Sequence, residues 1–175
     1  MLAVLCSYVT FSAPTNHRTY RRSSNTQRPI QRERSALKTS TPHFETKVQS
    51  PEPDSTAPDG SYVRLLLRLD RGSMAHFELP PGETSAAVMH RTVEEIWYFL
   101  SGCGEMWRKL NDQEEVVKVE AGVCITIPLG THFQFRASGS VPLSAIAVTM
   151  PPWPGEGEAV VVSGKWKPTV NHGGL

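Results

Sequence analysis

The chain has 175 residues, of which 39% are hydrophobic, so it can bury one sizeable core. No apolar run approaches the ~20 residues that a membrane-spanning helix requires, and we expect no such segment. Residues 1–50 hold eight Lys/Arg and two Asp/Glu, whereas residues 51–175 hold ten and fifteen. An acidic body without a basic cluster offers no electrostatic basis for binding nucleic acid.

Residues 1–55 are rich in Ser, Thr, Arg, Pro and Gln and show no hydrophobic periodicity, which predicts a disordered basic extension. A composition rich in Arg and Ser and poor in acids is typical of an organelle transit peptide. An extension read from a wrongly assigned start codon explains the same stretch equally well. We therefore expect a cytoplasmic protein, or an organelle protein where the extension is a transit peptide. The three cysteines lack CxxC spacing, which favours a reducing compartment.

A linker rich in Pro, Asp and Gly (PEPDSTAPDG) precedes the first strand-like run. From Tyr62 onward short β-patterned runs alternate with turn residues, and helical periodicity is almost absent. The expected strands lie at residues 62–69, 74–79, 85–90, 94–100, 105–110, 115–120, 123–127, 132–136, 143–150 and 159–164. This pattern predicts an all-β fold, a barrel or double-sheet jelly roll over residues 56–168, followed by a flexible tail at 169–175.

The run EEIWYFL carries the first candidate chemistry. Alternate side chains of a strand share a face, so an inward Glu95 places Trp97 and Phe99 inside the barrel as well. A carboxylate between two aromatic rings is costly unless a cation or hydrogen-bond donors meet it. Glu95 is therefore expected to bind a metal, or to have a raised pKa and act as a catalytic acid or base. Arg136 is a competing cation that could pair with Glu95.

The same alternation places His132, Gln134 and Arg136 on one face of the expected strand at 132–136. It also places His90 and Val88 on one face of the expected strand at 85–90. The two faces converge if both strands line one mouth of the barrel. Gln134 could then make a weak further contact or orient a bound water.

Two spacings resemble the motifs of the cupin family over about residues 65–150. In the first, four residues separate His90 from Glu95 and six separate Glu95 from Gly102, as the family pattern requires, but Val88 stands where the first histidine belongs. In the second, Gly122 and the Pro-x-Gly turn at 128–130 match, and His132 follows one residue early.

The resemblance implies a cupin β-barrel in which His90, Glu95 and His132 bind a divalent metal, with one ligand position left empty by Val88. Such a set with open positions suits Fe, Mn or Zn. It would support a metal-dependent enzyme of the oxygenase or isomerase type.

The aromatic residues Trp97 and Phe99, together with Gln134 and Arg136, are then the expected substrate-binding residues. The alternative is a metal-free cupin module that binds a small molecule without catalysis. Cupins often pair through edge strands, so the resemblance also implies a homodimer.

Overall fold

The computed structural model describes residues 43–170, and among these residues every regular element is a β-strand. The strands are β1 (Ser55–Thr56), β2 (Tyr62–Leu69), β3 (Gly72–Leu79), β4 (Val88–His90), β5 (Glu94–Ser101), β6 (Cys103–Leu110), β7 (Gln113–Glu120), β8 (Cys124–Ile127), β9 (His132–Ser138), β10 (Leu143–Met150) and β11 (Ala159–Val161). The predicted all-β fold is confirmed. The predicted disorder and targeting role of the extension fall largely on residues 1–42, which lie outside the described residues.

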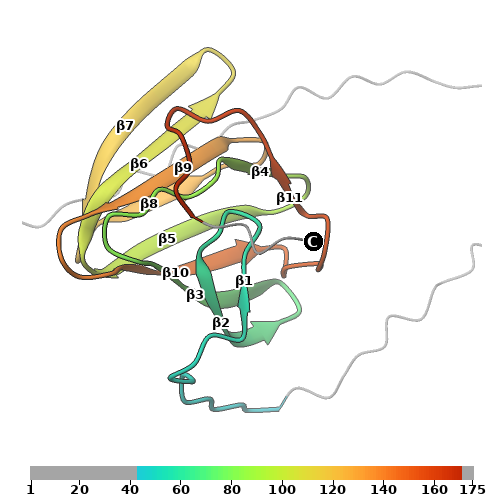
Figure 1. Ribbon diagram of the computed structural model, residues 1–175. Helices are drawn as coiled ribbons and strands as arrows, with labels where there is room; N and C mark the ends of the chain where they lie inside the picture. Colours follow the sequence, from blue (N-terminus) through green and yellow to red (C-terminus); the bar gives the residue numbers. More distant parts are fainter. Residues whose placement is uncertain (1–42, 171–175) are drawn as a thin grey trace, which may run out of the picture. The chain divides into compact units, whose positions relative to one another are not determined.

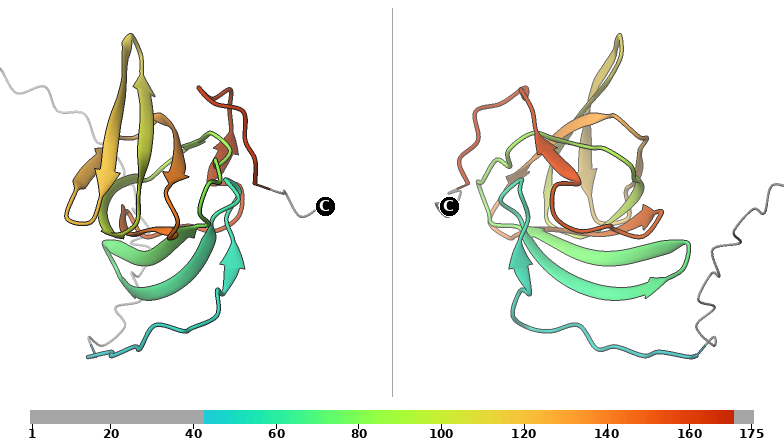
Figure 2. Two further views of the ribbon diagram at one scale, coloured as in Figure 1. Left: turned by 60° about the vertical axis from the view of Figure 1, so that its left-hand side comes forward. Right: turned by 90° about the vertical axis from the view of Figure 1, so that its right-hand side faces the viewer.

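The strands form two antiparallel sheets that face each other (Figures 1 and 2). One sheet has the order β1-β2-β3-β10-β5-β8 and the other has the order β11-β4-β9-β6-β7. From β3 to β10 the chain passes repeatedly from one sheet to the other, and only β6 and β7 are hairpin neighbours within a sheet. This crossing between two sheets is the double-sheet jelly roll that the sequence predicted.

The aromatic core lies between the sheets and is centred on Trp97, which is 1% exposed. Its ring stacks on Phe77 of β3 at a centroid distance of 5.0 Å. On the opposite sheet it meets Phe135 edge-on at 5.3 Å and Phe133 at 6.1 Å. Rings of this size bury much apolar surface, and edge-on pairs add a further favourable term. Trp97 therefore holds the two sheets together, and the predicted inward face of β5 is confirmed.

Segments on both sides of the barrel are hydrogen-bonded to it. The Arg64 guanidinium donates to the carbonyl oxygen of Pro51 at 2.8 Å, and Asp54 N–H donates to Val63 at 2.8 Å. At the other end, Thr169 N–H donates to the carbonyl oxygen of Thr84 at 3.0 Å.

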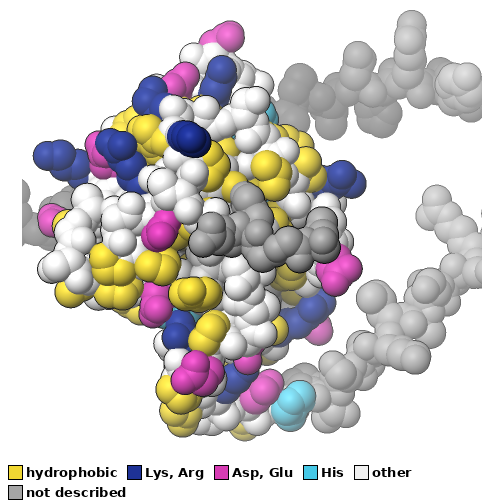
Figure 3. Space-filling model, viewed as in Figure 1, with side chains coloured by type: hydrophobic (Ala, Val, Ile, Leu, Met, Phe, Trp, Pro, Cys, Tyr) yellow, Lys and Arg dark blue, Asp and Glu magenta, His cyan; other side chains and the backbone are white. Residues whose placement is uncertain are grey.

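The surface in Figure 3 shows basic and acidic side chains interspersed, with hydrophobic groups between them. Among residues 43–170, no helix is long and apolar enough to cross a membrane.

Replacing Gly102 by Ala is expected to destabilise the fold more than replacing Gly82. Both glycines have positive φ, 74° and 75°, so either alanine carries backbone strain of about 1–2 kcal/mol. A Cβ at 102 would also lie 2.4 Å from the carbonyl oxygen of Pro142, whereas a Cβ at 82 meets nothing within 4 Å. Urea unfolding of the two variants measures the difference. Equal losses of unfolding free energy would show that the β5–β6 turn relaxes without cost.

Candidate functional site

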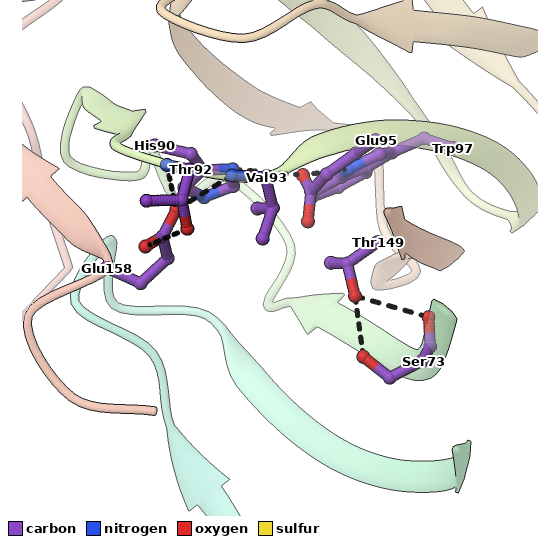
Figure 4. Close-up of polar contacts among 8 residues, drawn as sticks. All are labelled: Ser73, His90, Thr92, Val93, Glu95, Trp97, Thr149 and Glu158. Carbon is purple, nitrogen blue, oxygen red and sulfur yellow. Dashed lines mark hydrogen bonds and ion pairs between the residues drawn. The ribbon is translucent and has the colours of Figure 1, made fainter. Parts of the chain in front are cut away.

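The structure brings two of the predicted site residues, His90 and Glu95, together inside one end of the barrel (Figure 4). His90 ends β4 and Glu95 is the second residue of β5, so a three-residue bend joins them. Their side chains are 6% and 2% exposed, and Nδ1 of His90 lies 3.7 Å from Oε2 of Glu95. Two titratable groups buried face to face in an aromatic core are a candidate functional site.

The carboxyl of Glu95 is neutral near pH 7. Burial raises the pKa of Glu95 to about 8; the hydrogen bond from Trp97 acts in the opposite direction, while the charges of Asp59 and Glu158 raise it further. Trp97 Nε1–H donates to Oε2 at 2.7 Å, which leaves the other oxygen to carry the proton. The raised pKa expected from the sequence is therefore present, and burial is its main cause.

The imidazole of His90 is also neutral. Burial lowers its pKa to about 4, against the opposing attraction of the Glu158 carboxylate. The ring is held edge-on between Phe133 and Trp153, each at a centroid distance of 5.2 Å. Its Nδ1 is buried and has no hydrogen-bond partner among the described residues. Although 3.7 Å is within ion-pair range, the contact with Glu95 is one between two neutral polar groups.

Glu158 fixes the bend between these two residues, a role that the sequence did not reveal. Its carboxylate accepts hydrogen bonds from Thr92 N–H at 2.6 Å, from the Thr92 hydroxyl at 2.8 Å and from Val93 N–H at 3.0 Å (Figure 4). Burial acts to raise the pKa of Glu158, but these hydrogen bonds outweigh it and hold the pKa below its usual range. Strand periodicity cannot identify such a residue, because Glu158 lies in the irregular segment after β10.

His132, the third predicted ligand, lies on the opposite face of β9 from the pair. Phe133 and Phe135 of β9 contact Trp97 in the interior, so alternation turns His132 outward. The predicted convergence of these faces does not occur. The family motif places its histidine three positions after the turn glycine, and that position holds Phe133. A loop shorter by one residue reverses the face of every side chain that follows.

Gln134 and Arg136 lie on the same outward face and contact the C-terminal segment. Gln134 donates to the carbonyl oxygens of Ser85 (2.8 Å) and Trp166 (2.9 Å) and accepts from Trp166 N–H at 2.8 Å. Arg136 donates from Nε to Glu105 at 2.7 Å, and its guanidinium lies 4.5 Å from the centroid of Trp166. Neither side chain reaches Glu95. The predicted aromatic pair, Trp97 and Phe99, belongs to the packed core.

The donor set inside the barrel does not fit a metal centre. Residues 43–170 contain no group of three or more His, Cys, Asp or Glu side chains that could hold a metal ion. The two remaining positions of the cupin ligand set are filled by Val88 and Phe133, which are 2% and 1% exposed. Protein zinc sites generally use three or four side-chain ligands, whereas only two of the four cupin ligand positions, His90 and Glu95, carry donor side chains.

Comparison with known proteins agrees with this fold. The family model described as a cupin domain matches residues 75–149. An uncharacterized protein of Methanocaldococcus jannaschii, MJ1618, is 33% identical over 100 residues, which cover 54% of this chain and 77% of the relative. The chain belongs to the cupin family.

Solved structures of low identity share the fold. A double-stranded β-helix protein from Klebsiella pneumoniae superposes with a TM-score of 0.51 at 17% identity, over 63% of this chain and 90% of that one. Streptomyces PAC13 with uridine superposes with a TM-score of 0.54 at 15% identity, over 69% of this chain and 92% of that one. Bacillus subtilis oxalate decarboxylase, a protein with Mn(II) centres, gives 0.52 at 18% identity, but the match spans 63% of this chain and only 30% of that one.

Glu95→Gln is expected to remove a loss of stability that the wild type shows as the pH rises to about 8. The usual pKa of a glutamate is 4.5, and that of Glu95 in the folded chain is about 8. Between these two pH values the folded chain keeps a proton on Glu95 that the unfolded chain releases, so the free energy of unfolding falls as the pH rises. His90 makes stability rise with pH, but only between about pH 4 and pH 6.5, since its pKa is lowered from 6.5 to about 4. From pH 6.5 to 8 the wild type should therefore lose up to about 1.4 kcal/mol per pH unit, and the variant should not.

Urea denaturation at several pH values across this window measures the slope. Glutamine keeps the shape of the neutral carboxyl and the acceptor for Trp97. Parallel slopes in the two proteins would mean that Glu95 is ionised in the folded state.

Proposed function

We propose that this cupin is a small-molecule binding module whose interior site works without a divalent metal. The observation that supports it most directly is the neutral pair of His90 and Glu95, buried 3.7 Å apart with Nδ1 of His90 lacking a partner. Ligand sites in proteins are mainly apolar and contain a few oriented polar groups. Phe133 and Trp153 supply apolar surface on either side of His90.

The protonation states define the group that such a pair would recognise. A protonated carboxyl donates a hydrogen bond, and an imidazole nitrogen without a proton accepts one. The ligand group that complements this donor and acceptor is a neutral one that both accepts and donates hydrogen bonds, such as a carboxamide or a hydroxyl. A carboxylate ligand would place a second negative charge near the carboxylate of Glu158, which is unfavourable in a buried site of low polarity.

The competing hypothesis is a metal-dependent enzyme, with Fe, Mn or Zn bound by His90, Glu95 and His132. The observation that favours it is the Mn(II) centres of oxalate decarboxylase, a protein of similar fold. It would require β9 to shift by one residue, so that His132 replaces Phe133 in the interior. Elemental analysis of the purified protein decides between the two. Stoichiometric metal that is lost in His132→Ala would support the enzyme hypothesis and overturn ours.

Benzamide is a suitable probe for the pair, since it carries a neutral amide on an aromatic ring. In NMR titrations near pH 7 we expect it to shift the resonances of His90 and Trp153, and benzoate to bind more weakly. His90→Leu should weaken benzamide binding because it removes the acceptor. His76→Leu is the matched control, because His76 is an equally buried histidine (5% exposed) on another strand. Equal effects of the two substitutions, or no shift with benzamide, would contradict the proposed site.

We also propose that two copies associate through the outer face of the sheet that contains β5. Ile96, Tyr98 and Leu100 of β5 are each more than 40% exposed there. Ile96 pairs with Val148, and Tyr98 pairs with Ile146 of β10, so the apolar strip is two strands wide. A continuous exposed apolar surface commonly marks an interface, and a twofold axis lets one patch cover its own copy.

Ile96→Glu is expected to convert a dimer into a folded monomer, because each interface would bury two carboxylates against apolar side chains. Light scattering during size-exclusion chromatography measures the mass, and circular dichroism monitors the fold. Val161→Glu provides the control, since Val161 is 59% exposed on β11 of the other sheet. A monomeric wild type would overturn the proposed interface.

A further inference from the structure

A second candidate binding site lies where the edges of the two sheets come together. The strands β7 and β8 are the last strands of their sheets and are not paired with each other. A groove of about 510 Å³ opens between the end of the β6–β7 hairpin and the segment that joins β8 to β9. The hairpin projects beyond the other strands in both views of Figure 2. A volume of this size lies within the range of about 300–1,000 Å³ found for small-molecule sites.

Arg108 of β6 spans this groove. Its guanidinium donates to the carbonyl oxygen of Thr126 on the free edge of β8, and from Nη2 to Glu115 Oε1 on β7 at 2.5 Å. These contacts use two of its five N–H donors. Its Nε is buried without a hydrogen-bond partner among residues 43–170. A guanidinium fixed at both sides, with a donor still unused, is a preorganised binding group.

Thr131 provides a second unused polar group in the wall of the groove. The residue is 2% exposed, and its hydroxyl has no hydrogen-bond partner in the described part of the chain. A buried hydroxyl without a partner is unfavourable by about 1–3 kcal/mol. Two residues that line the groove, Arg108 and Thr131, thus each keep a buried polar atom without a hydrogen-bond partner among residues 43–170.

This groove is separate from the His90–Glu95 pair. Phe133 is the cross-strand partner of Arg108, and its ring also contacts His90 at 5.2 Å. Phe133 thus lies beside both sites, and the groove does not depend on the proposed function of the pair.

The charges of the groove indicate which ligand it would accept. Its lining contains one basic residue and three acidic residues, so an anion is disfavoured. A cation would be repelled by Arg108, and it would leave the unused Nε donor unsatisfied. Hydroxyl groups suit both the basic and the acidic side chains of the lining, because they accept hydrogen bonds from a guanidinium and donate hydrogen bonds to carboxylates. Leu110 and Pro128 add apolar surface against which a ring can pack.

We propose that this groove binds a neutral polyhydroxylated molecule of sugar size, anchored by Arg108 and Thr131.

Titration of the ¹⁵N-labelled protein with glucose, maltose and myo-inositol tests the proposal. At least one of these probes should shift amide resonances at residues 110–115 and 126–131, with a dissociation constant in the millimolar range. Thr131→Val should weaken that binding about fivefold, the equivalent of one hydrogen bond. The substitution should not reduce stability, since the hydroxyl has no partner to lose. Thr56→Val, on exposed β1, should leave binding unchanged.

Arg108→Met should weaken binding further, although it also removes the contacts with β7 and β8. The valine variant therefore provides the cleaner measurement. Spermidine and citrate complete the set as cationic and anionic probes. The proposal is overturned if none of the three polyols shifts these amides, if Thr131→Val binds like the wild type, or if spermidine or citrate binds there more tightly than every polyol.

Discussion

The direction of the side chains along β9 is the constraint on which the interior depends. Phe133 and Phe135 point inward and pack edge-on against Trp97, which joins the two sheets. The same alternation turns His132, Gln134 and Arg136 to the other side of the strand. Shifting β9 by one residue would bring a histidine inside, but it would also remove two aromatic rings from the centre of the core. The packing of Trp97 therefore opposes a histidine at this position.

Two of the four cupin ligand positions hold apolar side chains, and the polar groups at the other two, His90 and Glu95, are deeply buried. An ionised Glu95 would be a charge buried among aromatic rings, and burial instead raises its pKa to about 8. The same burial lowers the pKa of His90 to about 4. Both groups become neutral, so their proximity needs no compensating charge. Glu158 remains ionised because Thr92 and Val93 supply its hydrogen bonds from the bend between the two residues.

Strand periodicity predicted most of the fold from the sequence. The expected runs at 62–69 and 143–150 coincide with β2 and β10, and the inward face of β5 is as expected. The site was less predictable. The sequence shows that His132 comes one residue early, but the consequence depends on which face of β9 packs against Trp97. The contacts of Glu158 and Trp166 could not be predicted, because both lie in irregular segments whose path is set by the folded barrel.

Those irregular segments make the two outer faces of the barrel unequal. On the sheet that contains β9, the C-terminal segment is fastened by the hydrogen bonds of Gln134 to Trp166 and by the guanidinium of Arg136 over its ring. Polar residues on this outward face thus hold the segment that contains Trp166. On the other sheet, Ile96 and Tyr98 point outward from β5 and remain 41% and 49% exposed. The apolar side chains on the outer face of β5 therefore remain partly exposed, whereas the polar side chains on the outer face of β9 are held against the segment that contains Trp166.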